Sequence, residues 1–379
     1  FLSSFDLAST RTVNINNFGG IFSLNGATTT FGGVIENAGR LTIEGPGTMT
    51  FTGANTYSGG TYVEDGATLA VGSAGALGTG GLVLGGGTLK YLGSFDFART
   101  VILNPGSGTF DTNGFNSTIS TVIGGDGGLT KAGAGTLTLT GNNTFLGDVA
   151  INGGVLAISA GSNLGAGTGL AINGGTLRVS DVAAITRQTT LTGAATFDIV
   201  DGYGGFSVYG NVGGSGSLIK TGAGALTLRD TANYTGGTTV SGGNLTGSTA
   251  SLQGNIVNNA LVYFGQDTDG TYAGVMSGTG TLSKFGSATL TLTGLNTHQG
   301  GTHVTAGTIA VGQDANLGDA TADISLRFGG TLRLLSSFDL SSGRDVELVT
   351  SGRVQLVSST NRIAGTIHGT STLAIEGPG

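Results

Sequence analysis

Short alternations of apolar and polar residues run along the whole chain. Leu137 and Leu139 are separated by one threonine, and Leu226 and Leu228 have the same spacing. Further pairs of this kind are Val13/Ile15, Leu41/Ile43, Leu69/Val71, Val149/Ile151, Leu170/Ile172, Leu290/Leu292, Ile309/Val311 and Leu373/Ile375. The period of two is typical of strands with one buried face. No apolar stripe at helical spacing persists between glycines, so the sequence predicts an all-β chain.

The segments between these strands are rich in residues that form turns. Glycine accounts for 76 of the 379 residues, and asparagine, aspartate and serine join it between the apolar pairs. Glycine supplies the positive φ angles that tight corners need. A flexible linker could have a similar glycine content, but a linker lacks the apolar residues that recur throughout this chain. We therefore expect short strands joined by tight corners.

One phrase occurs four times, which predicts stacked repeats. Copies one to four are GPGTMTFTGANTYSGG from Gly45, GAGTLTLTGNNTFLGD from Gly133, GAGALTLRDTANYTGG from Gly222 and GSATLTLTGLNTHQGG from Gly286. The first two intervals between copies are nearly equal and the third is shorter, while IEGP at Ile43 returns at Ile375. Self-similarity of this kind marks a solenoid, in which each unit stacks on its neighbour.

Two further families of short repeats support the long period. SFD recurs within the segments that start at Phe1, Tyr91 and Leu334, and GGTL begins at Gly86, Gly174 and Gly329. We interpret residues 1–379 as a single β-helix repeat region, a fragment of something longer. Its superrepeats lie near 1–90, 91–178, 179–333 with one coil missing, and 334–379 as a partial copy.

A β-solenoid fits the repeats better than a sandwich or barrel does. A single sandwich of this length would be oversized, whereas a solenoid can add coils of about 20 to 25 residues without limit. The sequence therefore predicts a parallel β-helix of about 16 to 17 coils, a stiff rod, at roughly 4.8 Å per coil.

The phrase also predicts which side chains face the interior. Its leucines should point inward and its threonines outward, because alternate residues of a strand occupy opposite faces. Asn55, Asn143 and Asn296 occupy one site of the phrase, where an amide can bond to corner backbone groups. An aromatic corner site follows, held by Tyr57, Phe145 and Tyr234 and, in copy four, by His298.

The consensus G-x-G-T-L-T-L-T-G-x-N-T-Y-x-G-G-T-x-V resembles the passenger-associated repeat of bacterial autotransporters. It is followed by segments such as GATLAVGSAGALG from Gly66 and AGTIAVGQDANLG from Ala306. The resemblance implies a right-handed parallel β-helix exported by type V secretion from a Gram-negative bacterium, either anchored at the outer membrane or released. Copy three departs from the consensus with LRDTANY at Leu228, and copy four with His298.

Composition narrows the possible partners and compartments. The absence of cysteine excludes disulfides and thiolate metal sites, and it suits either a reducing compartment or an exported chain that must stay threadable. A formal charge of −7 argues against nucleic acid, whose phosphates require a basic face. No apolar run is long enough to suggest membrane insertion.

Candidate chemistry is sparse. A polysaccharide-cleaving β-helix needs several carboxylates close together, and the local acidic groups are Asp198 with Asp201, Asp267 with Asp269, and Asp314 with Asp319 and Asp323. We interpret them as solvated corners, since DTDG at Asp267 lacks the further carboxylates of a calcium loop. His298 and His303 flank a Gly-Gly turn without a third ligand nearby, so we expect exposed polar substitutions there, and His368 stands alone.

We therefore nominate no catalytic, cofactor-binding or metal-binding residue, and we predict that the chain is not an enzyme. Glycine-rich strings such as GGDGG at Gly124 precede no helix, and GRD at Gly343 is not a recognised integrin triplet. The leading hypothesis is an extracellular structural or adhesive stalk that spaces or joins surfaces in a biofilm matrix. A self-associating fibre subunit and, less favoured, a polysaccharide-active enzyme are the alternatives. Expected partners are further copies end to end, or neighbouring coils of the same chain, and surface or matrix glycans.

Overall fold

The computed structural model describes residues 6, 10–200, 205–358 and 360–377, and they form an all-β fold. Besides strands, the described residues contain three 3₁₀ helices and no α-helix. The 3₁₀ helices are η1 (Ala74–Leu77), η2 (Gly161–Leu164) and η3 (Asp314–Leu317). The all-β prediction is therefore confirmed.

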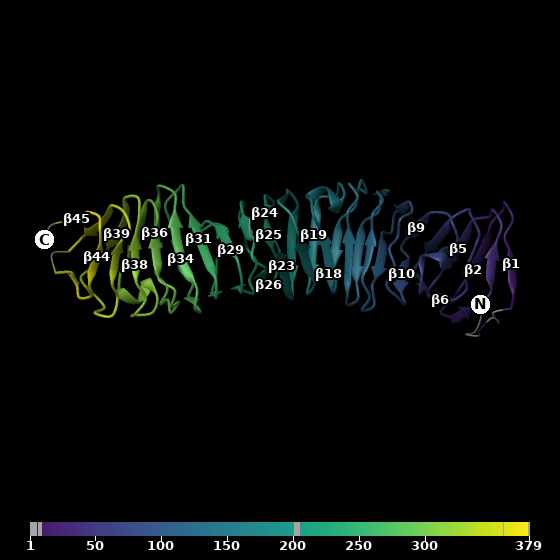
Figure 1. Cartoon of the computed structure of the whole chain (residues 1–379), viewed down its shortest axis with the longest axis horizontal. Coiled ribbons are helices and arrows are strands. Elements are labelled where there is room, and N and C mark those ends of the chain that lie inside the picture. Colours follow the sequence, from purple (N-terminus) through teal and green to yellow (C-terminus); the bar gives the residue numbers. More distant parts are fainter. Residues whose placement is uncertain (1–5, 7–9, 201–204, 359, 378–379) are drawn as a thin grey trace. The chain divides into compact units, whose positions relative to one another are not determined.

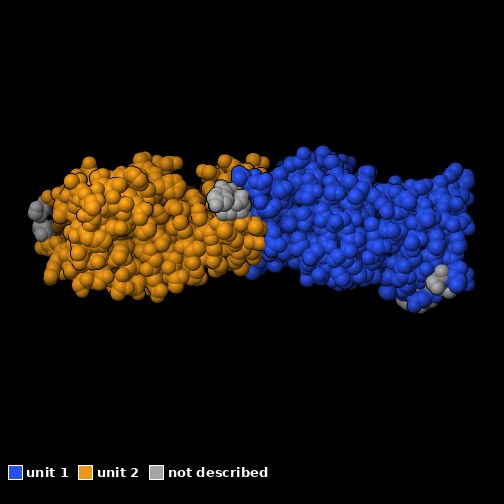
Figure 2. All heavy atoms as spheres, in the orientation of Figure 1, with its two compact units in different colours: residues 1–183, 187–195 blue, residues 184–186, 196–379 orange. Residues whose placement is uncertain are grey.

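The chain divides into two compact units, coloured separately in Figure 2. Unit 1 comprises residues 1–183 and 187–195, and unit 2 comprises residues 184–186 and 196–379. Strands β21 (Ala183–Ile185) and β23 (Ala194–Ile199) each contain a boundary between the units. The single repeat region from 1 to 379 stays a prediction.

Unit 1 is built from parallel sheets whose neighbouring strands come from successive coils. A short pair joins β1 (Thr12–Asn14) to β4 (Val34–Glu36). One sheet contains, in order, β3 (Thr28–Phe31), β6 (Gly47–Phe51), β8 (Ala67–Val71), β10 (Thr88–Tyr91), β12 (Gly108–Asp111), β15 (Leu129–Ala132), β17 (Val149–Ile151), β19 (Gly169–Asn173) and β22 (Gln188–Thr192). A second contains β2 (Gly20–Ser23), β5 (Leu41–Glu44), β7 (Thr61–Glu64), β9 (Leu82–Gly85), β11 (Val101–Leu103) and β14 (Ile123–Gly124). A third contains β13 (Ser117–Ile119), β16 (Thr136–Leu139), β18 (Val155–Ile158) and β20 (Thr176–Val179).

Unit 2 repeats this arrangement, with β25 (Val212–Gly213) among its strands. One sheet contains β26 (Ser217–Thr221), β28 (Thr238–Val240), β30 (Ile256–Asn258) and β33 (Met276–Ser277). Another contains β24 (Gly205–Val208), β27 (Ala225–Leu228), β29 (Asn244–Gly247), β31 (Leu261–Gly265), β34 (Thr281–Phe285), β36 (Thr302–Val304), β38 (Ile324–Leu326), β41 (Val346–Leu348) and β44 (Ile367–Gly369). The others contain β32 (Gly270–Tyr272), β35 (Thr289–Leu292), β37 (Thr308–Val311), β39 (Gly330–Leu334), β42 (Gly352–Leu356) and β45 (Leu373–Glu376), and β40 (Asp339–Leu340) with β43 (Arg362–Ile363).

Each step between paired strands is one coil, so the fold is a parallel β-solenoid (Figure 1). The shortest steps include that from Asn244 to Leu261, and the longest include that from Thr308 to Thr331. The described residues make about 18 turns. The number exceeds the predicted 16 to 17 because several coils, among them the one that starts at Asn244, are shorter than the expected length.

The interior is apolar, and the register prediction for the phrase is confirmed. Leu137, Leu139, Leu226, Leu290 and Leu292 are completely buried. Leu228 is also buried, with 3% of its surface exposed. The threonines between them lie on the outer faces, half-buried among their neighbours. Strand alternation alone therefore fixes the core of the solenoid.

The phrase moves to a different face from copy to copy, because its period is not a whole number of coils. In unit 1 the ladder from β6 passes through β8, β10 and β12 to β15, which is four coils, and copy two begins on the next strand, β16. In unit 2 the ladder from β27 passes through β29 and β31 to β34, which is three coils, and copy four begins on β35. The loops that follow the phrase therefore do not form a single row.

Candidate functional site

The loops after β6, β16 and β35 contain a buried asparagine that bonds to the coils on both sides. The Oδ1 atom of Asn143 accepts the N–H of Ile123 at 2.8 Å, and its Nδ2 donates to the carbonyl of Asn163 at 2.5 Å. Asn55 makes the same two bonds to Ile35 and Ala76, and Asn296 makes them to Met276 and Asn316. A buried amide left without such partners would destabilise the fold. The predicted role of these asparagines at corner backbone groups is confirmed.

The aromatic corner site is buried, and its residue pairs with the residue four positions later. Tyr57 Oη lies 2.6 Å from Thr61 Oγ1, and Tyr234 has the same partner in Thr238 at 2.7 Å. In copy two, Phe145 and Val149 replace both members, so a buried hydroxyl is absent from both sides of that contact. The threonine hydroxyl also donates to a main-chain carbonyl, that of Leu77 for Thr61, so it is the buried tyrosine hydroxyl that depends on the pair.

The expectation that His298 is an exposed polar substitution is wrong. His298 is completely buried at the aromatic site, and its Nε2 lies 3.0 Å from Thr302 Oγ1. Burial and the nearby Arg344 guanidinium lower its pKa to about 4, so the ring is neutral at physiological pH. Because the imidazole fills the tyrosine position and binds the same threonine, the corner packing of copy four is preserved.

A 3₁₀ helix in the next coil packs on the loop in copies one, two and four, and a later arginine caps it. Arg187 donates to the carbonyls of Leu164 at 2.8 Å and Gly165 at 2.6 Å, at the end of η2. Arg99 contacts the carbonyls of Ala74 and Gly78 around η1 in the same way. Cations beside the last carbonyls of a helix satisfy acceptors that lack a partner within it.

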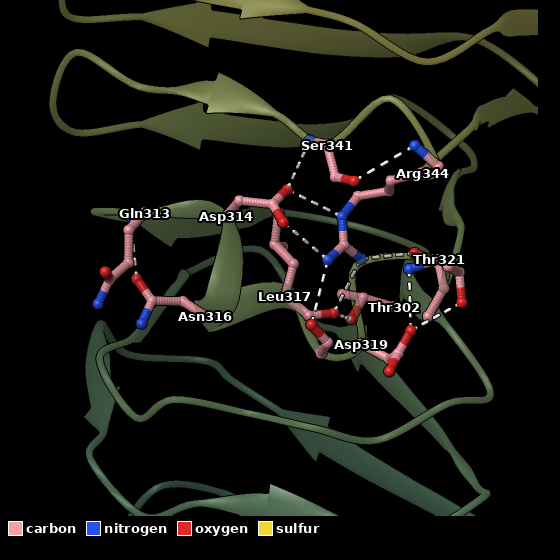
Figure 3. A network of polar contacts seen from close by, with 12 residues as sticks. Thr302, Gln313, Asp314, Asn316, Leu317, Asp319, Thr321, Ser341 and Arg344 are labelled. Carbon is pink, nitrogen blue, oxygen red and sulfur yellow. Dashed lines mark hydrogen bonds and ion pairs between the residues drawn. The ribbon is translucent and has the colours of Figure 1, made fainter.

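Arg344 is the most extensive of these caps (Figure 3). It is completely buried, its Nε lies 3.0 Å from Asp314 Oδ1, and its Nη atoms donate to carbonyls that include Gly318 at 3.1 Å and Leu317 at 3.3 Å. The GRD triplet at Gly343 thus contributes its arginine to the interior. Asp319, of the same acidic group as Asp314, is also used locally, since it accepts the N–H and the hydroxyl of Thr321, which hold its pKa below the usual range.

Three buried lysines were not recognised from the sequence. Lys131, Lys220 and Lys284 are completely buried on β15, β26 and β34. Each Nζ donates to three main-chain carbonyls at 2.6 to 3.2 Å, two beside it in the chain and one from the next coil. Burial lowers the pKa of each to about 8. The signal was their common position before copies two, three and four, where copy one has Ile43.

The remaining candidate residues do not converge. His303 lies on the outer face of β36, whereas His298 is buried, so the two imidazoles face different surroundings. Asp269 accepts the N–H of Thr289 at 2.7 Å, and Asp198 accepts the hydroxyl of Thr221 at 3.1 Å. Asp201 lies outside the described residues.

The described part of the chain contains neither a cluster of metal ligands nor a membrane-spanning helix. No three histidine, cysteine, aspartate or glutamate side chains there come together as a metal site. Among the same residues no helix has the length and apolar character needed to cross a membrane.

A concave pocket lies on the outer surface of unit 2, at the carboxyl ends of β27, β29, β31 and β34. Its volume is about 260 Å³, and its lining includes Arg229, Ser248, Gly265, Asp267 and Phe285. Arg229 belongs to the LRDTANY segment, in which copy three departs from the consensus. The pocket therefore coincides with a departure from the repeat.

Comparison with known proteins identifies the repeats. The passenger-associated-transport-repeat family matches residues 44–71, 129–158, 218–246 and 282–311, and each of these ranges contains one complete copy of the phrase. The adhesin BmaC autotransporter of Brucella suis biovar 1 is 38% identical over 252 residues, 65% of this chain. The chain carries the repeats of autotransporter passengers. A passenger of this family is secreted and surface-exposed.

The relatives are much longer than the regions that match this passenger sequence. The alignment spans 7% of the BmaC adhesin. An extracellular serine protease of Serratia marcescens is 67% identical over 36 residues, which are 10% of this chain and 3% of the protease. No solved structure matches the chain.

Proposed function

We propose that this passenger sequence acts as a non-catalytic, adhesive β-helix at the bacterial surface, where it spaces or joins surfaces. The observation that carries the proposal is the similarity to an adhesin over 65% of the chain. The distribution of repeated and variable residues in each coil agrees with an adhesive role. The residues that the copies of the phrase share form the core and the corners. The outer faces are left free to vary and to make contacts.

The polar groups of the corners support a structural role for them. The buried lysines, the capping arginines and the loop asparagines all bond to main-chain carbonyls or amides of neighbouring coils. These bonds hold successive coils in register. The similarity to the serine protease extends over 36 residues, 3% of that protein, and carries no argument for catalysis by this chain.

Surface display tests the proposal. The chain is placed between an export signal and a heterologous outer-membrane translocator, and adhesion of the bacteria to epithelial cells and to abiotic surfaces is counted. The matched control displays the same chain with Leu139→Asp and Leu226→Asp, which disrupts the core of both units without removing the segment. Adhesion of the native chain that the control lacks supports the proposal. Equal adhesion by both strains, or hydrolysis of a polysaccharide or protein substrate by the purified chain, would overturn it.

The proposed partners are glycans and further copies of the chain. Light scattering of the purified chain over a range of concentrations distinguishes self-association of the chain from binding to glycans. Growth of the scattering mass with concentration indicates self-association, and a constant monomer mass with retained adhesion leaves surface ligands as the partners.

A further inference from the structure

The pocket of unit 2 is made by a row of residues, one from each successive coil. The ladder pairs Thr227 with Thr246 and Gly265 with Phe285. Continued by two residues from the first pair, it places Arg229 beside Ser248, and Ser248 in turn beside Gly265. Neighbouring strands are about 4.8 Å apart. The row Arg229, Ser248, Gly265 and Phe285 therefore crosses the outer surface of the coils as a short trough.

An aromatic ring closes one end of this trough. A Cβ atom at Gly265 would lie 2.7 Å from Phe285 Cζ, so the Phe285 ring lies over the main chain of Gly265. Tyr263 contacts the same ring edge to face, with centroids 6.0 Å apart. Phe285 nevertheless remains 40% exposed. The absence of a side chain at Gly265 thus leaves room for the tip of the Phe285 ring, which stays partly exposed in the trough.

Charged groups of both signs line the rest of the pocket. The exposed Arg229 guanidinium lies over the ring of Tyr209, with Cζ 5.8 Å from the ring centroid. Asp267 and Thr268 follow β31 and complete the lining. A cation over an aromatic face is held in place without losing its hydrogen-bond donors. The pocket therefore presents donors, acceptors and an apolar face together.

A buried glutamine fixes the two loops that bear these groups. Gln266 is 1% exposed, and its Oε1 accepts the N–H of Thr249 at 2.9 Å. Its Nε2 donates to Thr249 Oγ1 at 3.2 Å and to the carbonyl of Thr268 at 3.3 Å. The loop beside Ser248 and the loop that holds Asp267 are thus joined through one buried side chain. Such preorganisation reduces the entropy lost on binding a ligand.

One residue of the trough marks a departure of copy three from the phrase. Arg229 stands where copies one, two and four have Thr52, Thr140 and Thr293. A groove of unit 1 offers a contrast, since its lining of serine, threonine, alanine, valine, leucine, glycine, aspartate and glutamine includes no aromatic ring. The combination of Phe285, Arg229 and Asp267 is therefore absent from that groove.

We propose that this pocket binds a neutral oligosaccharide, an inference that rests on the adhesive function proposed above and names its ligand class. The C–H face of a pyranose stacks on an exposed aromatic ring, and adjacent hydroxyls pair with planar groups such as a guanidinium and a carboxylate. Asp267 in the pocket and the chain's charge of −7 disfavour an acidic glycan. A mixed cation and anion lining suits a ligand that has hydroxyl donors and acceptors but no net charge.

Saturation-transfer NMR and calorimetry on the full chain test the proposal with a panel of neutral tetrasaccharides of glucose, galactose and mannose. At least one is expected to bind, and Phe285→Ala or Asp267→Asn should weaken its affinity about tenfold. Phe328→Ala is the matched control, because Phe328 is a 72% exposed phenylalanine of the same unit outside the pocket lining. Its affinity should equal that of the native chain.

Several outcomes would overturn the proposal. These are no binding by any member of the panel, tighter binding of a uronic-acid tetrasaccharide than of every neutral one, or equal weakening by Phe328→Ala. The displayed chain distinguishes this proposal from the adhesive function. Adhesion that survives Phe285→Ala while saccharide binding is lost leaves the pocket assignment intact and assigns adhesion elsewhere. Saccharide binding by a chain that confers no adhesion retains the pocket and rejects the adhesive function.

Discussion

The corners of copy two and copy three contain the same turn built with different parts. In copy two, Asn143 bridges three coils, η2 follows in the next coil, and Arg187 caps it. In copy three, Ala232 replaces the asparagine, and residues 248–252 contain a turn without a described 3₁₀ helix. The main-chain bond between coils is nevertheless kept, from Asn143 to Ser162 and from Ala232 to Ala250, each at 3.0 Å.

The difference shows that inward-facing residues and main-chain bonds stack the coils, whereas the polar corner parts are exchangeable. Ser251 of copy three fixes its turn with other hydrogen bonds, since its Oγ donates to the carbonyl of Leu228 at 3.2 Å and accepts the N–H of Ser248 at 2.9 Å. Where the corner is relaxed in this way, the outer surface acquires Arg229 and the pocket. Variation in the repeat thus makes room for a binding surface without loss of the core.

The largest effect is expected in the core, and it should be equal in the two copies. Leu139→Asp in copy two and Leu226→Asp in copy three each bury an unpaired carboxylate, which should lower the free energy of unfolding by about 4 kcal/mol or more. Urea unfolding followed by circular dichroism measures the loss. Thr138→Asp, on the outer face, is the control and should change stability little. A much smaller loss in copy three would show that its core, not only its corner, is relaxed.

The second prediction compares the loss of stability on removing a buried arginine with the loss on removing an exposed one. Arg344→Ala leaves Asp314 and several buried carbonyls without their donor, which should lower the free energy of unfolding by about 3 kcal/mol. Arg229→Ala, on the outer surface of copy three, should leave stability nearly unchanged. Thermal and urea unfolding of the two variants check the contrast. Similar losses would mean that Arg229 also supports the fold.

The sequence predicts the residues that obey the simple alternation. Leucine spacing gives the register, glycine gives the corners, and the shared asparagine site gives a bond to the main chain, because each depends on local geometry. The repeats themselves predicted the solenoid, which the structure confirms, and the resemblance to passenger repeats added the expectation of export. These features need no knowledge of which coils are neighbours.

The residues that the sequence did not reveal all depend on contacts between coils. Lys131 occupies an inward position, and its charge is accepted there because the carbonyl of Gly153, from the next coil, faces it. His298 was not recognised as a buried residue because its burial depends on the next coil, where Gly318 lies against the ring, although its partner Thr302 is only four residues away. The sequence also did not reveal that successive copies of the phrase lie on different faces. This depends on the interval between copies, which is a whole number of coils plus a fraction of one.

The third prediction compares the polar parts of the two corners. Asn143→Ala removes two buried hydrogen bonds and leaves their former partners shielded from water, so it should cost about 2 kcal/mol. Ser251→Ala removes the weaker network of copy three and should cost about 1 kcal/mol. Chemical unfolding of both variants gives the order. The reverse order would indicate that the serine turn, rather than the asparagine bridge, is the stronger corner.

The fourth prediction concerns the hydroxyl pair that copy two lacks. Phe145→Tyr places a buried hydroxyl against Val149 without a partner, which should cost about 1 kcal/mol or more. Adding Val149→Thr supplies the partner seen between Tyr57 and Thr61, and should recover about 1 kcal/mol as a coupling energy. The double-mutant cycle measures that coupling directly. A coupling of zero would mean that the two positions change independently.

The smallest effect is a pH dependence of the buried lysines. The pKa of Lys220 is lowered from its usual 10.5 to about 8 by burial, so between these values the unfolded chain binds more protons than the folded one. The native chain should therefore gain stability, relative to Lys220→Met, as pH rises from about 8 to about 10.5. We expect a gain below about 1 kcal/mol, because the three carbonyls around Nζ favour the charged ammonium and oppose the effect of burial.

Urea unfolding of both proteins at about pH 7.5 and about pH 10 isolates this difference, since other titrating groups are common to the two. A loss of stability of the native chain relative to Lys220→Met over that interval would show that the effect of the carbonyls on the pKa of Lys220 exceeds the effect of burial. The charge of the lysine would then stabilise the corner in copies two to four. In copy one the apolar side chain of Ile43 fills the same position.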